Sequence, residues 1–353
     1  MEKPINSISL VIDGKQISVP SGTTILDAAK QVGITIPALC YHPKVSRSGA
    51  CRVCIVEVGG TLVTACTTPV SGGMEVITNS PYVENMRRDL IDLILSDHPY
   101  DCMVCQKTGE CELQELAYKY SIRNPVFRGE RRQYAQKDGN PFIDRDMEKC
   151  ILCGRCVKIC DEVQGVGAID FAYKGFWAKV CPPFEQDLNC EFCGQCVMVC
   201  PTGALIGKNW VARGRYWNMR EVESTCPYCG VGCTLSLHVK ENEIVRVTAK
   251  EGRGVNDGLL CVKGRFGYQF VSSPDRLKTP LIRRRKGGDL EPATWDEALG
   301  VVASRLKRVK EQYGPDAIAG LSSARCTTED NYLFQKFMRA AVGTNNVDHC
   351  ARL

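Results

Sequence analysis

The first residues of the chain alternate between apolar and polar, which predicts strands. Apolar side chains occupy every second position on either side of an Asp-Gly pair within residues 8–19. That pair favours a tight hairpin turn. Thr24, with Asp27 three positions later, has the pattern of a capped helix start. Two further alternating segments, 53–58 and 61–65, complete the prediction of a small mixed sheet with one helix.

Apolar residues three and four positions apart predict two helices within residues 83–120. The first stripe consists of Met86, Leu90, Leu93 and Ile94, and the second of Leu113, Leu116, Ala117 and Tyr120. Residues 124–148 are polar instead, and their basic side chains include Arg128, Arg131, Arg132 and Lys137. We expect this stretch to be a solvated connector or a partner-facing loop and not a nucleic-acid patch.

The last third of the chain contains both the alternation typical of strands and the three-to-four residue spacing typical of helices. The expected strands are 235–239, 244–247, 281–284 and 316–321, and the expected helices run from Thr294 to Gly314 and over 329–342. Thr294 with Glu297 forms a capping box at the first helix start. A strand, loop and helix in succession is how open α/β folds place ligands at strand ends.

Composition narrows the class of protein. The 353 residues are 44% hydrophobic and 24% charged, which is typical of a soluble globular protein of two or three domains. The net charge of +5 is too mild to indicate a nucleic-acid partner. No apolar run of transmembrane length and no hydrophobic signal core occurs, so we expect no membrane insertion and a cytoplasmic location.

Cysteine is the unusual residue, because the chain contains 22 of them. They gather in C-x-x-C groups, whereas a disulfide needs two opposed Cβ atoms and an oxidising compartment. Clustered thiols in a reducing compartment indicate metal binding. Three thiols fall outside the groups: Cys181, Cys326 and Cys350.

Two sets of ligand-type residues precede residue 120. The first has the spacing C-x10-C-x2-C-x11-C and comprises Cys40, Cys51, Cys54 and Cys66. This spacing alone leaves zinc and iron both open. The second set comprises His98, Cys102, Cys105 and Cys111. Three cysteines need a fourth ligand to close a site, and His98 lies one turn before them.

The strongest signal is a duplicated run with the spacing C-x2-C-x2-C-x3-C. The two copies are Cys150, Cys153, Cys156 and Cys160, and then Cys190, Cys193, Cys196 and Cys200. This is the bacterial two-cluster ferredoxin signature, in which the fourth cysteine of each run ligates the other cluster. That resemblance pairs Cys200 with the first three thiols and Cys160 with the last three.

A further set has the spacing C-x2-C-x3-C-x27-C and comprises Cys226, Cys229, Cys233 and Cys261. It resembles the 4Fe-4S domain at the start of the molybdenum or tungsten bis-pterin oxidoreductases. In that family a lysine two residues after the fourth cysteine bridges cluster and pterin, and Lys263 stands at this position. The resemblance implies that Lys263 relays electrons between the two cofactors.

The earlier sets also resemble a known series of modules. The hairpin–helix layout before Cys40 is similar to the β-grasp 2Fe-2S ferredoxin of the large iron–sulfur subunit of respiratory complex I. The His98 set is similar to the His-ligated 4Fe-4S site of the same subunit. We disfavour the complex I subunit as a whole, because it carries one cluster where this chain repeats the full ferredoxin motif.

As a whole the chain resembles the front of a formate dehydrogenase alpha subunit that carries complex I-like modules. This implies an α+β multi-domain fold with one 2Fe-2S cluster, four 4Fe-4S clusters and a molybdenum or tungsten bis(pyranopterin guanine dinucleotide). The implied domains are a 2Fe-2S ferredoxin (1–80), a His/Cys 4Fe-4S helical domain (81–123), a two-cluster ferredoxin (140–212), a 4Fe-4S bis-pterin domain (219–275) and an incomplete α/β molybdopterin oxidoreductase domain (276–353).

The implied reaction is the reversible oxidation of formate to CO2. The alternative is an electron-transfer subunit of an iron–sulfur hydrogenase or a complex I-like NADH dehydrogenase, without catalysis of its own. No dinucleotide-binding glycine motif occurs, so we expect an NAD(P)-binding flavoprotein, ferredoxin or hydrogenase subunit as partner. In the resembling family the residue that binds the metal follows the last residues of this chain, and we hypothesise that a selenocysteine codon ends it at Leu353.

Overall fold

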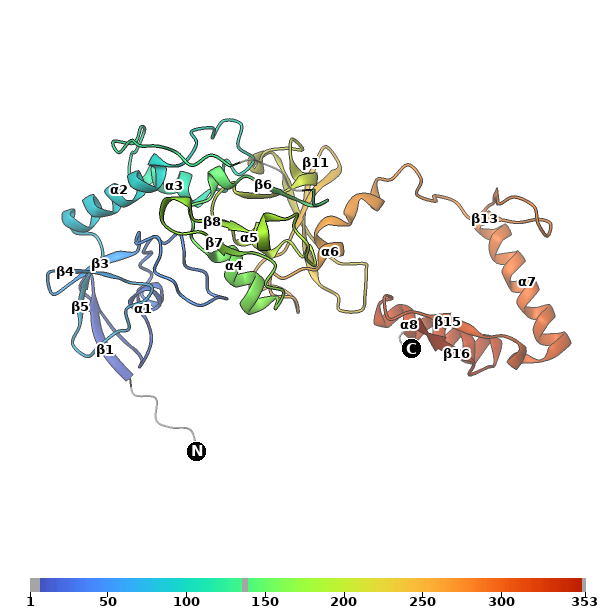
Figure 1. Cartoon of the computed structure of the whole chain (residues 1–353). Coiled ribbons are helices and arrows are strands. Elements are labelled where there is room, and N and C mark those ends of the chain that lie inside the picture. The colour runs from blue at the N-terminus through green and yellow to red at the C-terminus, as the bar shows by residue number, and fades with distance from the viewer. Residues whose placement is uncertain (1–6, 135–138, 351–353) are drawn as a thin grey trace. The chain divides into compact units, whose positions relative to one another are not determined.

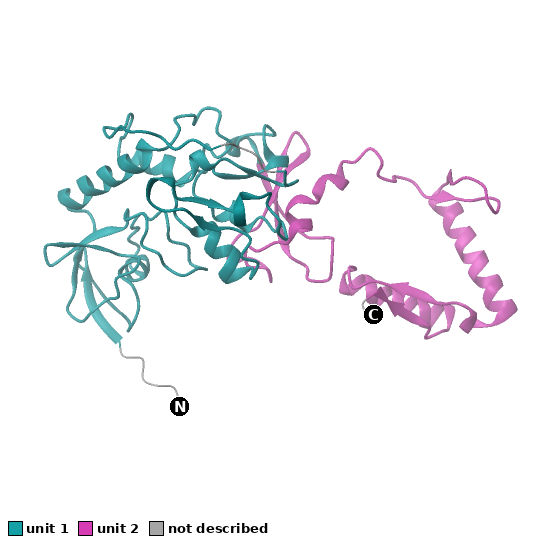
Figure 2. Ribbon diagram, in the orientation of Figure 1, with its two compact units in different colours: residues 1–219 teal, residues 220–353 magenta. Residues whose placement is uncertain are grey.

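A computed structural model describes residues 7–134 and 139–350 of this mixed α/β protein. It has two compact units, which divide between Met219 and Arg220 (Figure 2). Within the described ranges, no helix is both long and apolar enough to cross a lipid bilayer.

The first unit opens with a five-stranded sheet and one helix (blue in Figure 1). The sheet order is β2-β1-β5-β3-β4, and the strands are β1 (Ser7–Ile12), β2 (Lys15–Pro20), β3 (Ile55–Val58), β4 (Thr61–Thr64) and β5 (Glu75–Ile77). The predicted hairpin and helix are confirmed, since β1 and β2 pair antiparallel and Thr24 caps α1 (Ile25–Gln31) by accepting a hydrogen bond from the Asp27 N–H. Fourteen buried residues, Cys54 and Cys66 among them, form the core of this part.

Two helices follow, and the prediction of their buried faces is half right. Helix α2 (Pro81–Ser96) buries Val83, Ile91 and Leu95 with the side chain of Arg87 between them, while the expected Leu93 is half exposed. The apolar pattern misplaced this face because Arg87, whose guanidinium donates to the Ile55 carbonyl, occupies one of its positions. Helix α3 (Glu112–Lys119) buries Leu113 as expected.

Residues 143–207 contain little regular structure. The strands are β6 (Ile143–Arg145), β7 (Asp170–Ala172), β8 (Lys179–Cys181) and β9 (Leu205–Gly207), and the helices are α4 (Arg155–Lys158), continued by a π-helical turn (Ile159–Val163), and α5 (Gln195–Val199). Strand β6 pairs with β9, and β7 with β8, both antiparallel. Short 3-10 turns cover Met147–Lys149, Gly175–Trp177, Pro183–Glu185, Lys208–Trp210 and Tyr216–Asn218. The cysteines of the duplicated run therefore lie on loops and short helices.

The prediction of a solvated connector over residues 124–148 is wrong at two points. Ile143 is buried in strand β6. Arg132 is only 10% exposed at its side chain and pairs with Asp97. Lys137 lies outside the described residues. Arg128 and Arg131 are exposed, as expected.

The second unit begins with a three-stranded antiparallel sheet in the order β10-β11-β12. Its strands are β10 (Arg220–Thr225), β11 (Thr234–Lys240) and β12 (Glu243–Thr248). The pair β11 and β12 is the predicted one, whereas β10 lacks apolar alternation and escaped prediction. Helix α6 (Val262–Phe266) and a 3-10 turn (Tyr268–Val271) follow the sheet.

The last segment contains two small sheets and two longer helices. Strands β13 (Leu281–Ile282) and β14 (Glu291–Pro292) form the predicted hairpin, and helix α7 (Trp295–Tyr313) is capped by Thr294. Strand β15 (Gly320–Ser322) pairs parallel with β16 (Val347–His349), and helix α8 (Thr328–Lys336) with a π-helical turn (Phe337–Val342) connects them. Strand β16 was not predicted, because three residues, two of them polar, are too few to show an alternation of apolar and polar positions.

Candidate iron–sulfur sites

The first four cysteines come together beside the five-stranded sheet. The Cys40 thiol is within hydrogen-bonding reach of both Cys51 and Cys66, and Cys66 also reaches Cys54. The Leu39 N–H donates to Cys51 Sγ at 3.4 Å. Three of the four thiols are buried. The structure thus brings four thiols, the donor type of iron–sulfur clusters, to one side of the sheet.

The mutual contacts change the acidity of these thiols. Hydrogen bonds from Cys51 and Cys66 lower the pKa of Cys40, and the Cys66 contact lowers the pKa of Cys54 to about 7. The same contacts raise the pKa of Cys51 and Cys66, so the thiolate is favoured at two of the four positions. A lowered pKa favours the thiolate, which is the form that binds metal. The residues present therefore fit a metal cluster at this position.

The second set surrounds a cavity of about 500 Å³ at the junction of α2 and α3. Its lining includes His98, Cys102 and Cys111 together with apolar side chains. His98 is 8% exposed, and its Nδ1 has no hydrogen-bond partner among the described residues. Burial lowers the pKa of His98 to about 4, so the imidazole is neutral near pH 7. A neutral, buried and unpartnered ring nitrogen suits a metal ligand.

Cys105 is the one member of this set that does not line the cavity. Its thiol faces Gly203 instead, and a Cβ built on Gly203 would lie 2.7 Å from Cys105 Sγ. The glycine leaves room that the Cys105 side chain occupies.

The duplicated run surrounds two separate small cavities. The thiols that line one of them are Cys150, Cys153, Cys156 and Cys200. The thiols that line the other are Cys160, Cys190, Cys193 and Cys196. Each cavity thus takes three thiols from one run and one from the other. This grouping supports cross-ligation, which stays a prediction.

The two copies also share a backbone conformation. Leu152 and Phe192, which precede the second cysteine of each run, have φ values of 53° and 50°, and the following Gly154 and Gly194 have 76° and 72°. The N–H groups of Leu152 and Phe192 point at sulfur, since they donate to Cys150 Sγ at 3.4 Å and to Cys190 Sγ at 3.3 Å. Backbone N–H groups aimed at sulfur stabilise a bound anionic cluster and shift its potential.

Burial makes these thiols weak acids in the absence of metal. It raises the pKa of Cys150 to about 11 and that of Cys153 to about 12, and it raises the pKa of Cys156 and Cys196 further. Buried thiols without a hydrogen-bonded cation need a positive centre to become thiolates. Iron in a cluster supplies that centre when it is bound.

The last set lies at the β10–β11 turn and the start of α6. The Cys226 N–H donates to the Cys233 carbonyl at 2.8 Å, and burial raises the pKa of the Cys226 thiol. Cys226 is buried and Cys261 is exposed. Lys263 is exposed as well, with its Nζ 6.0 Å from the centre of the Tyr228 ring.

No three ligand-type side chains in the described ranges converge tightly enough to hold a single metal ion. Clusters contain several metal atoms and bind thiolates around their periphery, so this spread is compatible with them. Of the remaining thiols, Cys181 is buried in β8, as expected for a structural cysteine, and Cys350 is exposed with its Sγ 3.5 Å from Ser323 Oγ.

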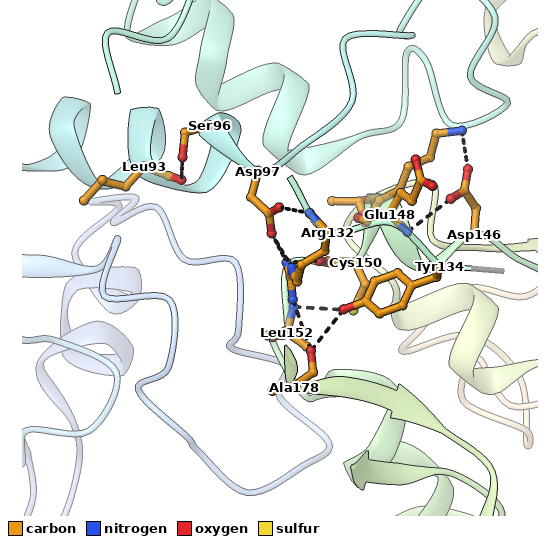
Figure 3. A network of polar contacts seen from close by, with 12 residues as sticks. Leu93, Ser96, Asp97, Arg132, Tyr134, Asp146, Glu148, Cys150, Leu152 and Ala178 are labelled. Carbon is orange, nitrogen blue, oxygen red and sulfur yellow. Dashed lines mark hydrogen bonds and ion pairs between the residues drawn. The ribbon is translucent and has the colours of Figure 1, made fainter. Parts of the chain in front are cut away.

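A polar network that was not predicted links the second and third sets. Figure 3 shows Arg132 between Asp97 and the backbone of Cys150 and Ala178. Asp97 precedes His98, so this guanidinium joins the loop of one site to the loop of another. Lys149 adds a second link, because its Nζ lies 2.8 Å from carboxylate oxygens of both Asp101 and Asp146. The sequence did not reveal this role, because arginine is common in polar connectors. Only the pairing with Asp97 distinguishes Arg132 from the other arginines of the segment.

Five family models match the chain in succession. They are a 2Fe-2S iron–sulfur cluster binding domain (6–81), the NADH-ubiquinone oxidoreductase-G iron–sulfur binding region (87–125), the NADH-quinone oxidoreductase subunit 3 ferredoxin-like domain (140–206), the molybdopterin oxidoreductase Fe4S4 domain (219–273) and molybdopterin oxidoreductase (276–353). These models establish iron–sulfur and molybdopterin-family domains, but the exact number of clusters stays a prediction.

Relatives match over nearly the whole chain. NADPH-Fe(3+) oxidoreductase subunit alpha of Geobacter sulfurreducens is 44% identical, and an NADH-quinone oxidoreductase polypeptide of the G type from Rhizobium meliloti is 40% identical; each match covers 98% of this chain and 40% of the relative. A Staphylococcus aureus protein named "Putative formate dehydrogenase" is 30% identical over 97% of this chain and 39% of its own. The chain thus spans about two fifths of the length of these relatives.

One solved structure is similar in fold and in sequence. It is an NAD+-reducing NiFe hydrogenase in the H2-reduced state, with a TM-score of 0.55 and 29% identity over 59% of this chain and 88% of that chain.

The comparisons correct two expectations. The duplicated motif falls inside the match to the subunit 3 ferredoxin-like domain, so it does not separate this chain from the complex I type, contrary to our expectation. Formate dehydrogenase is the more distant resemblance, and nothing in the comparisons supports selenocysteine. The chain therefore consists of domains that match iron–sulfur domains of the NADH-quinone oxidoreductase G type, followed by domains that match molybdopterin oxidoreductase.

Proposed function

We propose that this chain is the electron-transfer portion of an NAD(P)H-linked oxidoreductase complex. The observation that carries the proposal is the presence of four ligand sets in the first compact unit. Three of the sets contribute side chains to the linings of cavities, and the Cys40 set has three buried thiols. Bound clusters would supply one-electron redox chemistry there. A series of such sites in one protein unit is suited to carrying electrons over a distance.

The assignment of residues to clusters is part of the proposal. We assign the 2Fe-2S cluster to the Cys40 set and a 4Fe-4S cluster to the His98 set, with Cys102, Cys105 and Cys111. Two more 4Fe-4S clusters belong to the duplicated run with crossed fourth ligands, and a further one to the Cys226 set. The five domain ranges given above follow from this assignment.

NAD(P)H is the proposed electron source, taken up by a flavoprotein partner. A nicotinamide gives up two electrons together, and a flavin is the cofactor that can pass them on singly. The relatives of 44% and 40% identity carry NADPH and NADH in their names, whereas the relative named for formate is 30% identical. This difference favours a pyridine nucleotide over formate.

The test is to purify the native complex without oxygen and follow cluster reduction by electron paramagnetic resonance. We expect NADPH or NADH to reduce the clusters within seconds, and the reduction to stop when the flavoprotein partner is removed. Formate is added in a parallel sample. Reduction by formate alone, with no response to either nucleotide, would refute the proposal.

Oxidation of formate is the second candidate, because the molybdopterin oxidoreductase models match residues 219–353 as two consecutive domains. In this case Lys263 would hold the position between the Cys226 set and a bis(pyranopterin guanine dinucleotide) of molybdenum or tungsten. The cation on its exposed side chain would stabilise negative charge that passes between the two.

Replacing Lys263 tests that role. Lys263→Ala should slow electron transfer from the pterin side to the Cys226 set by tenfold or more while iron content stays normal. Lys263→Arg, which keeps the cation, should retain most of the rate. Stopped-flow absorbance measures the rate, and equal rates in all three proteins would remove the assigned role.

A further inference from the structure

One buried arginine contacts three of the ligand loops at once. Arg155 lies between Cys153 and Cys156 at the start of α4, and its side chain is 6% exposed. It donates two hydrogen bonds to the Glu112 carboxylate, at 2.6 and 2.8 Å, and one to the Ala38 carbonyl at 3.1 Å. This forked geometry is the one that guanidinium forms with a carboxylate.

The two partners of Arg155 stand next to ligands of other sets. Glu112 directly follows Cys111, and Ala38 is two residues before Cys40. The Glu112 N–H also donates to the Pro201 carbonyl at 2.9 Å, and Pro201 follows Cys200. Leu39, Val53 and Cys111 pack in one buried group beneath these contacts. The loops of three predicted clusters therefore meet at a single side chain.

We propose that Arg155 is the positioning residue of an electron-transfer junction. It holds the Cys40, His98 and Cys150 sets at fixed mutual distances and places one positive charge among them. This inference rests on the proposed electron-transfer function and adds to it a branch point, at which electrons pass between three clusters instead of moving along a single file.

The charge acts in a definite direction. Each cluster becomes more negative when it accepts an electron, so a nearby cation favours the reduced state. The Glu112 side chain is 46% exposed whereas that of Arg155 is 6% exposed, so water screens the carboxylate more than the guanidinium. Arg155 follows Cys153 by two residues and binds the carbonyl of Ala38, two residues before Cys40, so its charge lies beside both sets.

Three variants of the full chain separate charge from geometry. Arg155→Met removes the cation and leaves Glu112 unpaired, so reduction of the Cys40 and Cys150 sets should become at least tenfold less favourable, a potential lower by about 59 mV. Glu112→Gln removes the anion and should raise the same potentials. Arg155→Lys keeps the charge and loses the fork, so its potentials should stay nearer the parent while the clusters lose their fixed separation.

The measurements are redox titration monitored by paramagnetic resonance and the magnetic interaction between pairs of reduced clusters. We expect opposite potential shifts in Arg155→Met and Glu112→Gln, and a weakened interaction in Arg155→Lys. Arg88→Met, at an exposed position of α2, is the matched control and should change neither reading. If Arg155→Met does not assemble its clusters, the milder Glu112→Gln and Arg155→Lys still decide the question.

The failure of this inference differs from a failure of the proposed function. Shifts of the same sign in both charge variants, or unchanged potentials with an unchanged magnetic interaction, would overturn the role of Arg155 while the parent still accepts electrons from NAD(P)H. If the parent protein contains no reducible clusters, both the proposed function and the inference about the Arg155 junction are refuted.

Discussion

At the scale of single residues, the clearest features are polar groups that are buried for a reason. The His98 ring nitrogen has no partner in the described structure, and the Arg132 guanidinium joins two ligand loops. A buried polar group without a partner costs about 1–3 kcal/mol in unfolding free energy. Such a group is retained where a function, such as binding a metal, offsets the cost.

His98 can be tested by changing the ligand type. His98→Ala should lose one cluster, about four iron atoms per chain, because three thiols alone do not close the site. His98→Cys offers a fourth thiolate, so it should keep the iron and change the potential of that cluster. Iron analysis with paramagnetic resonance measures both, and a full iron content in His98→Ala would show that His98 is not a ligand.

Arg132 can be tested by stability. Arg132→Met leaves the Asp97 carboxylate without its partner, and we expect a loss of about 2–4 kcal/mol, below the largest values for fully buried pairs because Asp97 keeps some solvent contact. Arg131→Met, at the exposed neighbouring position, should change stability by less than about 0.5 kcal/mol. Denaturant-induced loss of cluster absorbance compares them, and equal midpoints would contradict the structural role.

At the scale of elements, the sequence predicted well where local patterns decide the structure. The first hairpin, the Thr24 cap and the start of α7 follow from alternation and capping residues, and all three are observed. Strand β10 and the buried side of α2 were missed, because tertiary partners determine them. Spacing predicted which cysteines belong to one run, whereas the crossed fourth thiols came from the ferredoxin resemblance and stay a prediction. The side on which Cys105 lies depends on Gly203, which is distant in sequence.

Crossed ligation of the duplicated run is a prediction at this scale. Cys160→Ser belongs to the first run by sequence, yet it should disturb the cluster held by Cys190, Cys193 and Cys196, because its thiol lines that cavity. Cys200→Ser should disturb the other cluster. Mössbauer and paramagnetic spectra of the two variants separate the outcomes. Loss of the cluster of its own run in Cys160→Ser would contradict the assignment.

At the scale of the whole molecule, burial is uneven between the parts that bear clusters. The five-stranded sheet has fourteen buried residues in one core. In the duplicated region the buried apolar residues are divided instead between the linings of the two cavities, which include Ile143, Ile169 and Leu205, and a small group of Val45, Ile159 and Val199. A small region whose buried side chains surround cluster sites, and do not form one continuous core, gains less from hydrophobic burial when those sites are empty. Metal binding then contributes a large part of its folding free energy.

Removal of iron should therefore unfold the chain unevenly. After treatment with a chelator and a reductant, we expect residues 140–212 to lose protection from hydrogen exchange first, while β1, β2 and α1 retain theirs. Hydrogen–deuterium exchange with mass spectrometry, before and after iron removal, measures this order. A uniform loss of protection over both regions would show that the apolar core does not hold the first domain independently.

Gly203 makes the two copies of the duplicated ferredoxin run unequal in their contacts. It stands three residues after Cys200, and the corresponding position after Cys160 is Val163. Because the Cys105 side chain fills the space where a Cβ of residue 203 would lie, a valine at this position would exclude it. The first copy contacts the same loop through polar side chains instead, since Lys149 pairs with Asp101. The two halves share a spacing and a backbone, yet they are not interchangeable. One copy thus presents bare backbone to the neighbouring loop where the other presents charged side chains, so an exchange of the two halves would break both contacts.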